Sequence, residues 1–235
     1  LTSFGKYVLG YADTIFSAGE ELLTNINDKL HENLFHVGVS SGLPKVITTG
    51  IISYVSKNFP EVSILVTEGD DKLLLEKIVS SECDIVFTDS ILNSKDSIIE
   101  SKNFLSSAIA IYGTKSYLKY GKNFPKSVEN IPILLPSIHT NLRYKIDQWF
   151  LNNHIHYNLV AELQDSGSKK ILASSGAGTL VISELGAEQL VAEKKVVKIL
   201  DIDEVEDFYY TIRPKHNSPM VIQLIEKFEE IWKIK

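Results

Sequence analysis

The stretch FHVGVSSGLPK, residues 35–45, joins an apolar run to small hydroxyl residues and a proline. A short apolar run that ends in turn residues is typical of a buried strand in a parallel sheet. Ser40, Ser41 and Gly42 would then lie between this strand and a helix that begins at Pro44. The first backbone N–H groups of a helix have no partner within it. Ser40 or Ser41 can therefore cap this helix, or leave its N-terminus open to a ligand.

The composition predicts a globular protein. Of the 235 residues, 44% are hydrophobic and 23% are charged. A chain of this length and hydrophobic content can bury one large core or two modest ones. The net charge of −6 argues against a surface that binds a phosphate backbone. No apolar run reaches the ~18 residues of a membrane span, and the single cysteine, Cys83, excludes an internal disulfide. We therefore expect a cytoplasmic chain, in a compartment that keeps thiols reduced, with no membrane partner.

Predicted strands and helices alternate with short joints, which predicts parallel sheets with right-handed crossovers. The alternation occurs first in residues 36–87 and again in residues 133–192. Between them, the polar, serine-rich residues 93–103 predict a loop or an edge, and the apolar run 105–112 predicts a crossing between two lobes. The predicted strands are residues 36–39, 62–67, 83–87, 133–135, 159–163, 178–182 and 208–212.

This order predicts two similar α/β lobes. Lobe I comprises residues 32–105 and 208–235, lobe II comprises residues 106–207, and a closing helix at residues 221–234 returns to lobe I. Ligands of open α/β sheets bind at the carboxyl ends of strands. A cleft between the lobes would collect the strand ends of both.

Residues 1–31 predict a separate long helix. Small and apolar residues recur at alternating spacings of four and three, which is a heptad pattern. We expect a dimerising helix of about 40 Å, or alternatively an amphipathic helix packed on its own domain. Since the chain opens at Leu1 and its only methionine is Met220, we also expect a cleaved leader or a missing N-terminal domain. The predicted long helix favours the second interpretation, that an N-terminal domain is missing. The heptad residues are Leu1, Gly5, Val8, Ala12, Ile15, Gly19, Leu22 and Ile26.

Several of these residues resemble a known family, the LysR-type transcriptional regulators. Leu1, Thr2 and Gly5 match the LTxxG with which the linker helix of that family starts. The segment YADTIF, residues 11–16, is closer to the activators of sodium/proton antiporters, and residues 133–150, ILLPSIHTNLRYKIDQWF, are similar in pattern to the second-lobe strand and helix of that subgroup. The resemblance implies a two-lobed effector-binding domain with Rossmann-like lobes and mixed sheets, like the type 2 periplasmic binding proteins. It also implies a homodimer or homotetramer that binds DNA through a winged helix-turn-helix absent from this chain.

Carried over by position, the effector contacts of the family fall at the strand ends. The resemblance thus implies a small molecule or an ion in the cleft between the lobes. The residues implied are Ser40, Ser41, Gly42, Thr88, Asp89, Ser90, Pro136, Ser137, Ile138, His139, Asp165, Ser166, Gly167 and Ser183.

The charges near these strand ends depart from the family's usual preference for anions. Arg143 and Arg213 are the only arginines, whereas Asp89, Asp165 and Glu184 fall on the predicted cleft. Carboxylate, carbonyl and hydroxyl oxygens suit a hard cation. Together with the antiporter-activator resemblance, this suggests the hypothesis of a sodium-sensing pocket. The alternative is that Asp89 and Asp165 only cap the helices that follow them.

Other candidate chemistry is weak. His154 and His156 lack further ligands nearby in sequence, so two surface histidines are a better interpretation than a metal site. Gly176 and Gly178 follow a predicted helix, whereas a phosphate loop precedes one, so we expect a helix C-cap. No catalytic motif or cofactor signature is present, and we expect no enzyme. Two functions remain: the sensing and oligomerising half of a transcriptional regulator, or an extracytoplasmic solute-binding protein whose leader has been removed.

Overall fold

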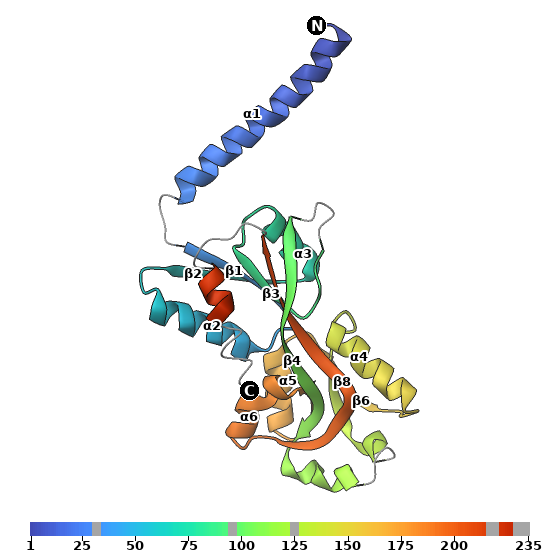
Figure 1. Cartoon of the computed structure of the whole chain (residues 1–235). Coiled ribbons are helices and arrows are strands. Elements are labelled where there is room, and N and C mark those ends of the chain that lie inside the picture. The colour runs from blue at the N-terminus through green and yellow to red at the C-terminus, as the bar shows by residue number, and fades with distance from the viewer. Residues whose placement is uncertain (30–33, 94–97, 123–126, 215–220, 228–235) are drawn as a thin grey trace.

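The structure, a computed structural model, describes residues 1–29, 34–93, 98–122, 127–214 and 221–227, and the side chains of residues 20–29 are not described. One curled eight-stranded mixed sheet, in the order β2-β1-β3-β8-β4-β7-β5-β6, runs through the molecule (Figure 1). Its two ends form separate α/β units, which we call the first half and the second half. The predicted α/β class with mixed sheets is confirmed.

The first half is built on three parallel strands with the helices α2 and α3 between them. β1 lies between β2 and β3 and pairs with both. This central position agrees with the burial of its alternate apolar residues. The predicted strands agree with the observed ones to within two residues. The elements are β1 (Leu34–Ser40), α2 (Lys45–Asn58), β2 (Ser63–Gly69), α3 (Asp71–Val79) and β3 (Ile85–Thr88).

The second half repeats this arrangement, with β5 parallel to both β6 and β7. Gly176 has a φ of 83° just after α5, which confirms the predicted helix C-cap. The elements are the 3-10 helices η1 (Lys115–Lys122) and η2 (Val128–Asn130), then β5 (Pro132–Pro136), α4 (Asn141–Asn152), β6 (Asn158–Leu163), α5 (Ser166–Ser174), β7 (Thr179–Ser183) and α6 (Glu184–Ala192).

Two long antiparallel strands, β4 (Ile99–Gly113) and β8 (Val197–Pro214), join the halves. They pair from Ile99 opposite Pro214 to Gly113 opposite Val197, with three register shifts along the way. The predicted start of β8 was wrong, since this strand begins at Val197 rather than at residue 208. Residues 93–103 were predicted as a loop or an edge, and residues 99–103 form strand that pairs with β8 and not with β7, which agrees with the edge alternative. Both segments are rich in polar residues, and pairing with a distant partner overrides their weak local strand preference.

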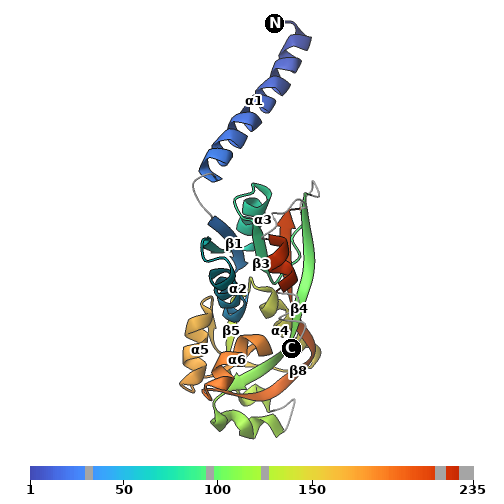
Figure 2. The ribbon, with the colours of Figure 1, turned by 60° about the vertical axis from the view of Figure 1, so that its left-hand side comes forward.

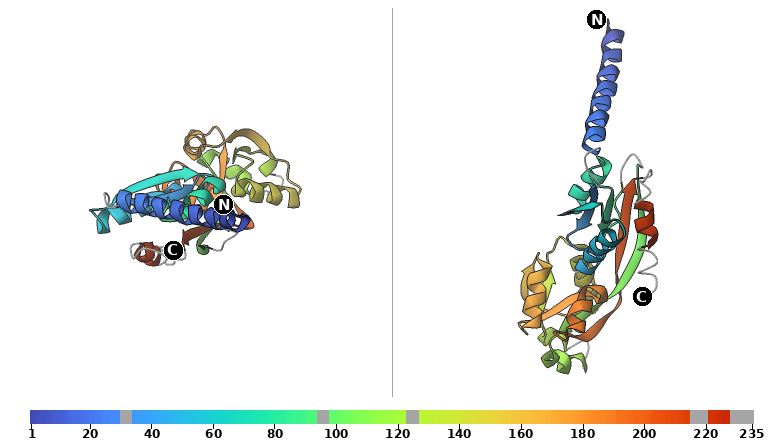
Figure 3. Two further views of the ribbon diagram at one scale, coloured as in Figure 1. Left: turned by 90° about the horizontal axis from the view of Figure 1, so that it is seen from above. Right: turned by 90° about the vertical axis from the view of Figure 1, so that its left-hand side faces the viewer.

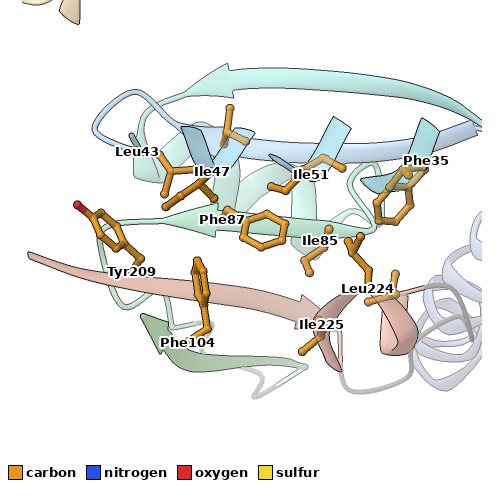
Figure 4. Close-up of a cluster of buried hydrophobic side chains, with 14 residues drawn as sticks. Phe35, Leu43, Ile47, Ile51, Ile85, Phe87, Phe104, Tyr209, Leu224 and Ile225 are labelled. Atoms are coloured by element: carbon orange, nitrogen blue, oxygen red, sulfur yellow. The ribbon is translucent and has the colours of Figure 1, made fainter. Parts of the chain in front are cut away.

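Each half has its own hydrophobic core. In the first half, Phe87 and Phe104 stack edge to face with ring centroids 5.7 Å apart, beneath Ile47 and Ile51 of α2 (Figure 4). Residues 221–227 are helical, and Leu224 and Ile225 belong to the same core. The closing helix therefore returns to the first half as predicted. Residues 228–234 of that prediction lie outside the described residues.

The helix α1 (Ser3–Lys29) extends away from the sheet in Figures 1 and 2 and in the right-hand view of Figure 3. The side chains of Leu1, Phe4 and Ile15 are 86%, 75% and 70% exposed. The predicted long helix is confirmed, and the alternative that it packs on its own domain is wrong. Among the described residues, no helix combines the length and apolar character needed to cross a membrane.

Candidate functional site

A cavity of about 980 Å³ lies where strand ends of the first half face those of the second. Its size suits a small molecule. The joints that follow β1, β2 and β3 contribute to its lining, as do the joints that follow β5 and β6, the end of β7, and Asp207 of β8. The predicted convergence of strand ends on one cleft is therefore observed.

Most of the predicted effector-binding residues meet in this cavity. Thr88, Ile138 and Gly167 do not line it; Thr88 is fully buried and Ile138 is 58% exposed. Whether the lining residues bind an effector stays a prediction. Those that line the cavity are Ser40, Ser41, Gly42, Asp89, Ser90, Pro136, Ser137, His139, Asp165, Ser166 and Ser183.

The joint between β1 and α2 is built around Asp89. The Ser40 hydroxyl donates to Asp89 Oδ1 at 2.8 Å, and Pro44 occupies the N-cap position of α2 without a side-chain cap. The hypothesis that Ser40 or Ser41 caps this helix is therefore wrong. A Cβ atom on Gly42 would lie 2.5 Å from Asp89 Oδ2, so the absence of a side chain at Gly42 lets this carboxylate fit.

Burial raises the pKa of Asp89 above its usual value, and the charges of Asp207 and Asp71 raise it further. The hydrogen bond from Ser40 opposes this shift because it stabilises the carboxylate. Asp89 caps no helix among the described residues, so the capping alternative is wrong for this residue.

Asp165 has the opposite environment. It is the N-cap of α5, and its carboxylate accepts hydrogen bonds from the backbone N–H groups of Gly167 and Ser168. Hydrogen bonds from Ser168 and Gly167 lower its pKa. The capping alternative is confirmed for Asp165. Glu184 does not line the cavity and accepts a hydrogen bond from Lys198 instead.

A polar network beside the cavity links β8 to β7 and α4. The Tyr209 hydroxyl lies 2.8 Å from Ser183 Oγ and 3.2 Å from Asp207 Oδ2. Lys145 of α4 donates to Asp207 Oδ1 at 2.9 Å. Ser183 also caps α6 by accepting from the Gly186 N–H at 3.2 Å. Its hydroxyl is thus held by two partners, which fixes this part of the cavity wall.

One contact joins the two halves directly across the cavity. The Asn141 side chain, at the start of α4, donates to the Asp89 carbonyl oxygen at 3.3 Å and to Ser90 Oγ at 2.5 Å. Sequence reasoning missed Asn141, because nothing local marks a residue whose partners lie 51 and 52 positions away.

Sequence reasoning also missed four lysines that line the cavity: Lys45 at the start of α2, Lys72 on α3, and Lys169 and Lys170 on α5. Burial lowers the pKa of Lys169 to about 8, and Asp165 partly opposes this shift. Burial and the nearby charge of Lys45 lower the pKa of Lys170. The sequence does indicate Lys169 and Lys170 as candidates, because they follow Asp165 within about one helical turn, on a helix that begins at a strand end.

The two arginines are used elsewhere. Arg143 is buried, and its guanidinium pairs with Asp147 and Glu162 at 2.9 Å, while Arg213 pairs with Glu100. Among the described residues, no group of three or more His, Cys, Asp or Glu side chains is arranged to hold a metal ion. The acidic residues that suggested a sodium site share the cavity with four lysines, and the sodium hypothesis stays a prediction.

We expect Gly42→Ala to lower the free energy of unfolding by about 1–3 kcal/mol, since its new methyl group would displace the Asp89 carboxylate. In an Asp89→Ala background the same substitution should cost less than about 0.5 kcal/mol. Gly10→Ala on α1 is the control, because no atom lies within 4 Å of its added Cβ. Urea denaturation measures all of these variants. An equal cost in both backgrounds would show that Asp89 is not the obstacle.

The opposite pKa shifts of Asp89 and Asp165 predict opposite dependences of stability on pH. A raised pKa means that the folded state holds the proton more tightly, so stability falls as the pH rises above the ordinary value of 3.8. Asp89→Asn should therefore be more stable than the parent at pH 7, by a margin that shrinks toward pH 3.8. Asp165→Asn should be less stable at pH 7, because a lowered pKa contributes stability above 3.8. Urea denaturation from about pH 3 to 8 checks both signs, and shifts of the same sign would refute this assignment.

Comparison with known proteins identifies the family. The family of the LysR substrate binding domain matches residues 29–232. The transcriptional activator protein NhaR of Escherichia coli strain K12 is 24% identical over 213 residues, which cover 90% of this chain and 70% of that protein.

Two solved structures share the fold. The effector binding domain of QuiR in complex with shikimate aligns with a TM-score of 0.63 at 15% identity, covering 86% of this chain and 98% of that one. Full-length CbnR complexed with its target DNA aligns with a TM-score of 0.64 at 14% identity, covering 98% of this chain and 81% of that one. Since the family match extends over most of the sequence, this chain belongs to the LysR substrate binding domain family.

Proposed function

We propose that this chain is the effector-sensing and oligomerising part of a LysR-type DNA-binding transcriptional regulator, with a small effector bound in the cavity between the two halves. The observation that carries this proposal is a cavity of about 980 Å³ lined by strand ends from both halves. The shikimate complex of the QuiR domain supports a small-molecule effector. We assign lobe I to residues 32–105 and 208–235, and lobe II to residues 106–207.

The proposed readout is a change in DNA binding. Support comes from CbnR, whose full-length structure was determined with its target DNA, and from NhaR, which is named a transcriptional activator. DNA contact would belong to a winged helix-turn-helix outside this sequence, and the protein would act in the cytoplasm, without catalysis. An effector that favours one arrangement of the lobes by 1–3 kcal/mol would change DNA affinity by about 5- to 150-fold.

The alternative, an extracytoplasmic solute-binding protein, shares the fold and the closure of the cleft. NhaR is named a transcriptional activator and CbnR was determined with its target DNA. In addition, α1 carries exposed apolar residues on a heptad pattern, which a solute-binding protein does not need. The regulator is therefore the better interpretation.

An effector that binds only the folded protein must raise its melting temperature. We expect at least one compound in a panel of small acids, amino acids, sugars and salts to do so, and to change the radius of gyration in small-angle X-ray scattering. For the sodium hypothesis, isothermal titration compares sodium chloride with potassium chloride at matched ionic strength. Indistinguishable heats for the two salts would refute the hypothesis that the cavity senses sodium. A panel without any stabilising compound would count against the effector-binding proposal itself.

Light scattering tests the oligomer. We expect a homodimer or homotetramer, because the apolar residues of α1 are exposed in the single chain. Replacing Val8 and Ile15 with lysine should lower the oligomer mass or raise its dissociation constant at least tenfold, since both lie on the heptad seam. Lysine at Ser3 and Ser17, which are exposed but off the seam, is the matched control. A monomer at high concentration of the unaltered chain would contradict the proposal.

A further inference from the structure

A second cavity, of about 580 Å³, lies between α4 and the part of β8 that follows Ile202. We call it the α4 pocket. It shares no lining residue with the larger cavity between the halves. The buried Asp207 lines the larger cavity and accepts a hydrogen bond from Lys145, which lines the α4 pocket. The two cavities are therefore separate sites, joined by one ion pair.

A bulge in β8 forms one wall of the α4 pocket. Ala108 and Ile109, consecutive residues of β4, pair with β8 on either side of residues 203–205, which have no partner in β4. Glu204 has a φ of 63°, in the left-handed region that L residues seldom adopt. Bulges change the direction of side chains and are frequent beside functional sites. This bulge carries the side chains of Asp203 and Glu204 into the lining of the pocket.

Three aromatic side chains line the α4 pocket. Tyr144 and Phe208 are exposed, whereas Trp149 is buried. One cation already lies against these rings, because the Lys145 ammonium group is 5.6 Å from the centroid of the Phe208 ring. Such a contact is favourable, since the face of an aromatic ring attracts positive charge. The pocket therefore offers surface to an apolar group and to a cation.

The α4 pocket also has an excess of negative charge. Among its lining residues Lys145 is the only base, and Asp207 balances its charge at 2.9 Å. Asp203, Glu204 and Glu206 line the pocket and are exposed. Within the described part of the chain, none of these three carboxylates forms an ion pair or a hydrogen bond. Three uncompensated charges beside exposed rings favour a positively charged ligand.

We propose that the α4 pocket is a second ligand site, which binds a small organic cation: an amine or a quaternary ammonium compound with an apolar body. The apolar body packs on Tyr144 and Phe208, and the cation lies near the carboxylates of Asp203 and Glu204. The volume of the pocket suits a ligand of this size. This site goes beyond the proposed function and does not depend on it, because it lies outside the larger cavity.

The probe for this site is benzyltrimethylammonium chloride, whose charge does not depend on pH. Isothermal titration compares it with benzyl alcohol, which has the ring without the charge, and with potassium chloride at matched ionic strength. We expect saturable binding of the organic cation, at least about threefold tighter than any binding of benzyl alcohol. Fluorescence locates the site: after Trp232→Phe, Trp149 is the only tryptophan, and its emission should change as the pocket fills.

Two variants remove the features on which the site depends. Asp203→Asn with Glu204→Gln should weaken binding about fivefold, because two exposed charges are lost. Phe208→Leu should weaken it about threefold, because the ring is lost. Glu61→Gln with Glu76→Gln is the matched control, since both residues are exposed and neither lines the pocket. Equal melting temperatures without ligand establish that the variants are folded.

Three results would overturn the proposal: no saturable binding of the organic cation, binding of benzyl alcohol that is equally tight, or unchanged binding in the double variant of Asp203 and Glu204. Glu68→Gln alters a carboxylate of the larger cavity and should leave binding unchanged. Weaker binding in that variant would place the cation in the larger cavity and would equally refute a site at α4.

Discussion

The antiparallel pairing of β4 with β8 is the constraint on which the rest of the structure depends. Each strand passes from one half to the other, and each supplies the backbone partners that the other needs along nearly its full length. A buried backbone N–H or C=O group that loses its hydrogen-bond partner destabilises the folded state. The halves are therefore held edge to edge in a single sheet, curled so that their strand ends face the same cavity.

This geometry also explains why charged side chains are concentrated between the halves. The cavity is too large to be filled by the residues at the joints, so polar groups can be partly buried there without displacing apolar ones. Asp89 is tolerated because Ser40 donates to it and Gly42 leaves room for it. Lys169 is compensated only in part, by the negative charge of Asp165.

Much of the fold could be predicted from sequence, because the signals are local. The strand ends at Ser40, Asp89 and Asp165 and the heptad residues of α1 follow from short apolar patterns next to polar residues. The polar first part of β8 could not be predicted, since its strand structure depends on partners that lie between 84 (Gly113 to Val197) and 100 (Ser107 to Asp207) positions away. For the same reason the contact of Asn141 with the β3 end was missed, and the lysines of α5 were missed because the acidic residues near them drew attention to a cation.

The contacts that cross the cavity are few and polar, and this limits the energy that an effector must supply. Asn141 meets Ser90 and the backbone of Asp89, and the Tyr209 hydroxyl meets Ser183 Oγ. Each such hydrogen bond contributes about 0.5–1.5 kcal/mol net. A rearrangement that exchanges these contacts therefore lies within the 1–3 kcal/mol of a typical allosteric coupling. Each half has its own apolar core, and Leu185 of α6 in the second half also packs against the core of the first half. A shift of the halves would therefore change this contact while most of each core moves with its own half.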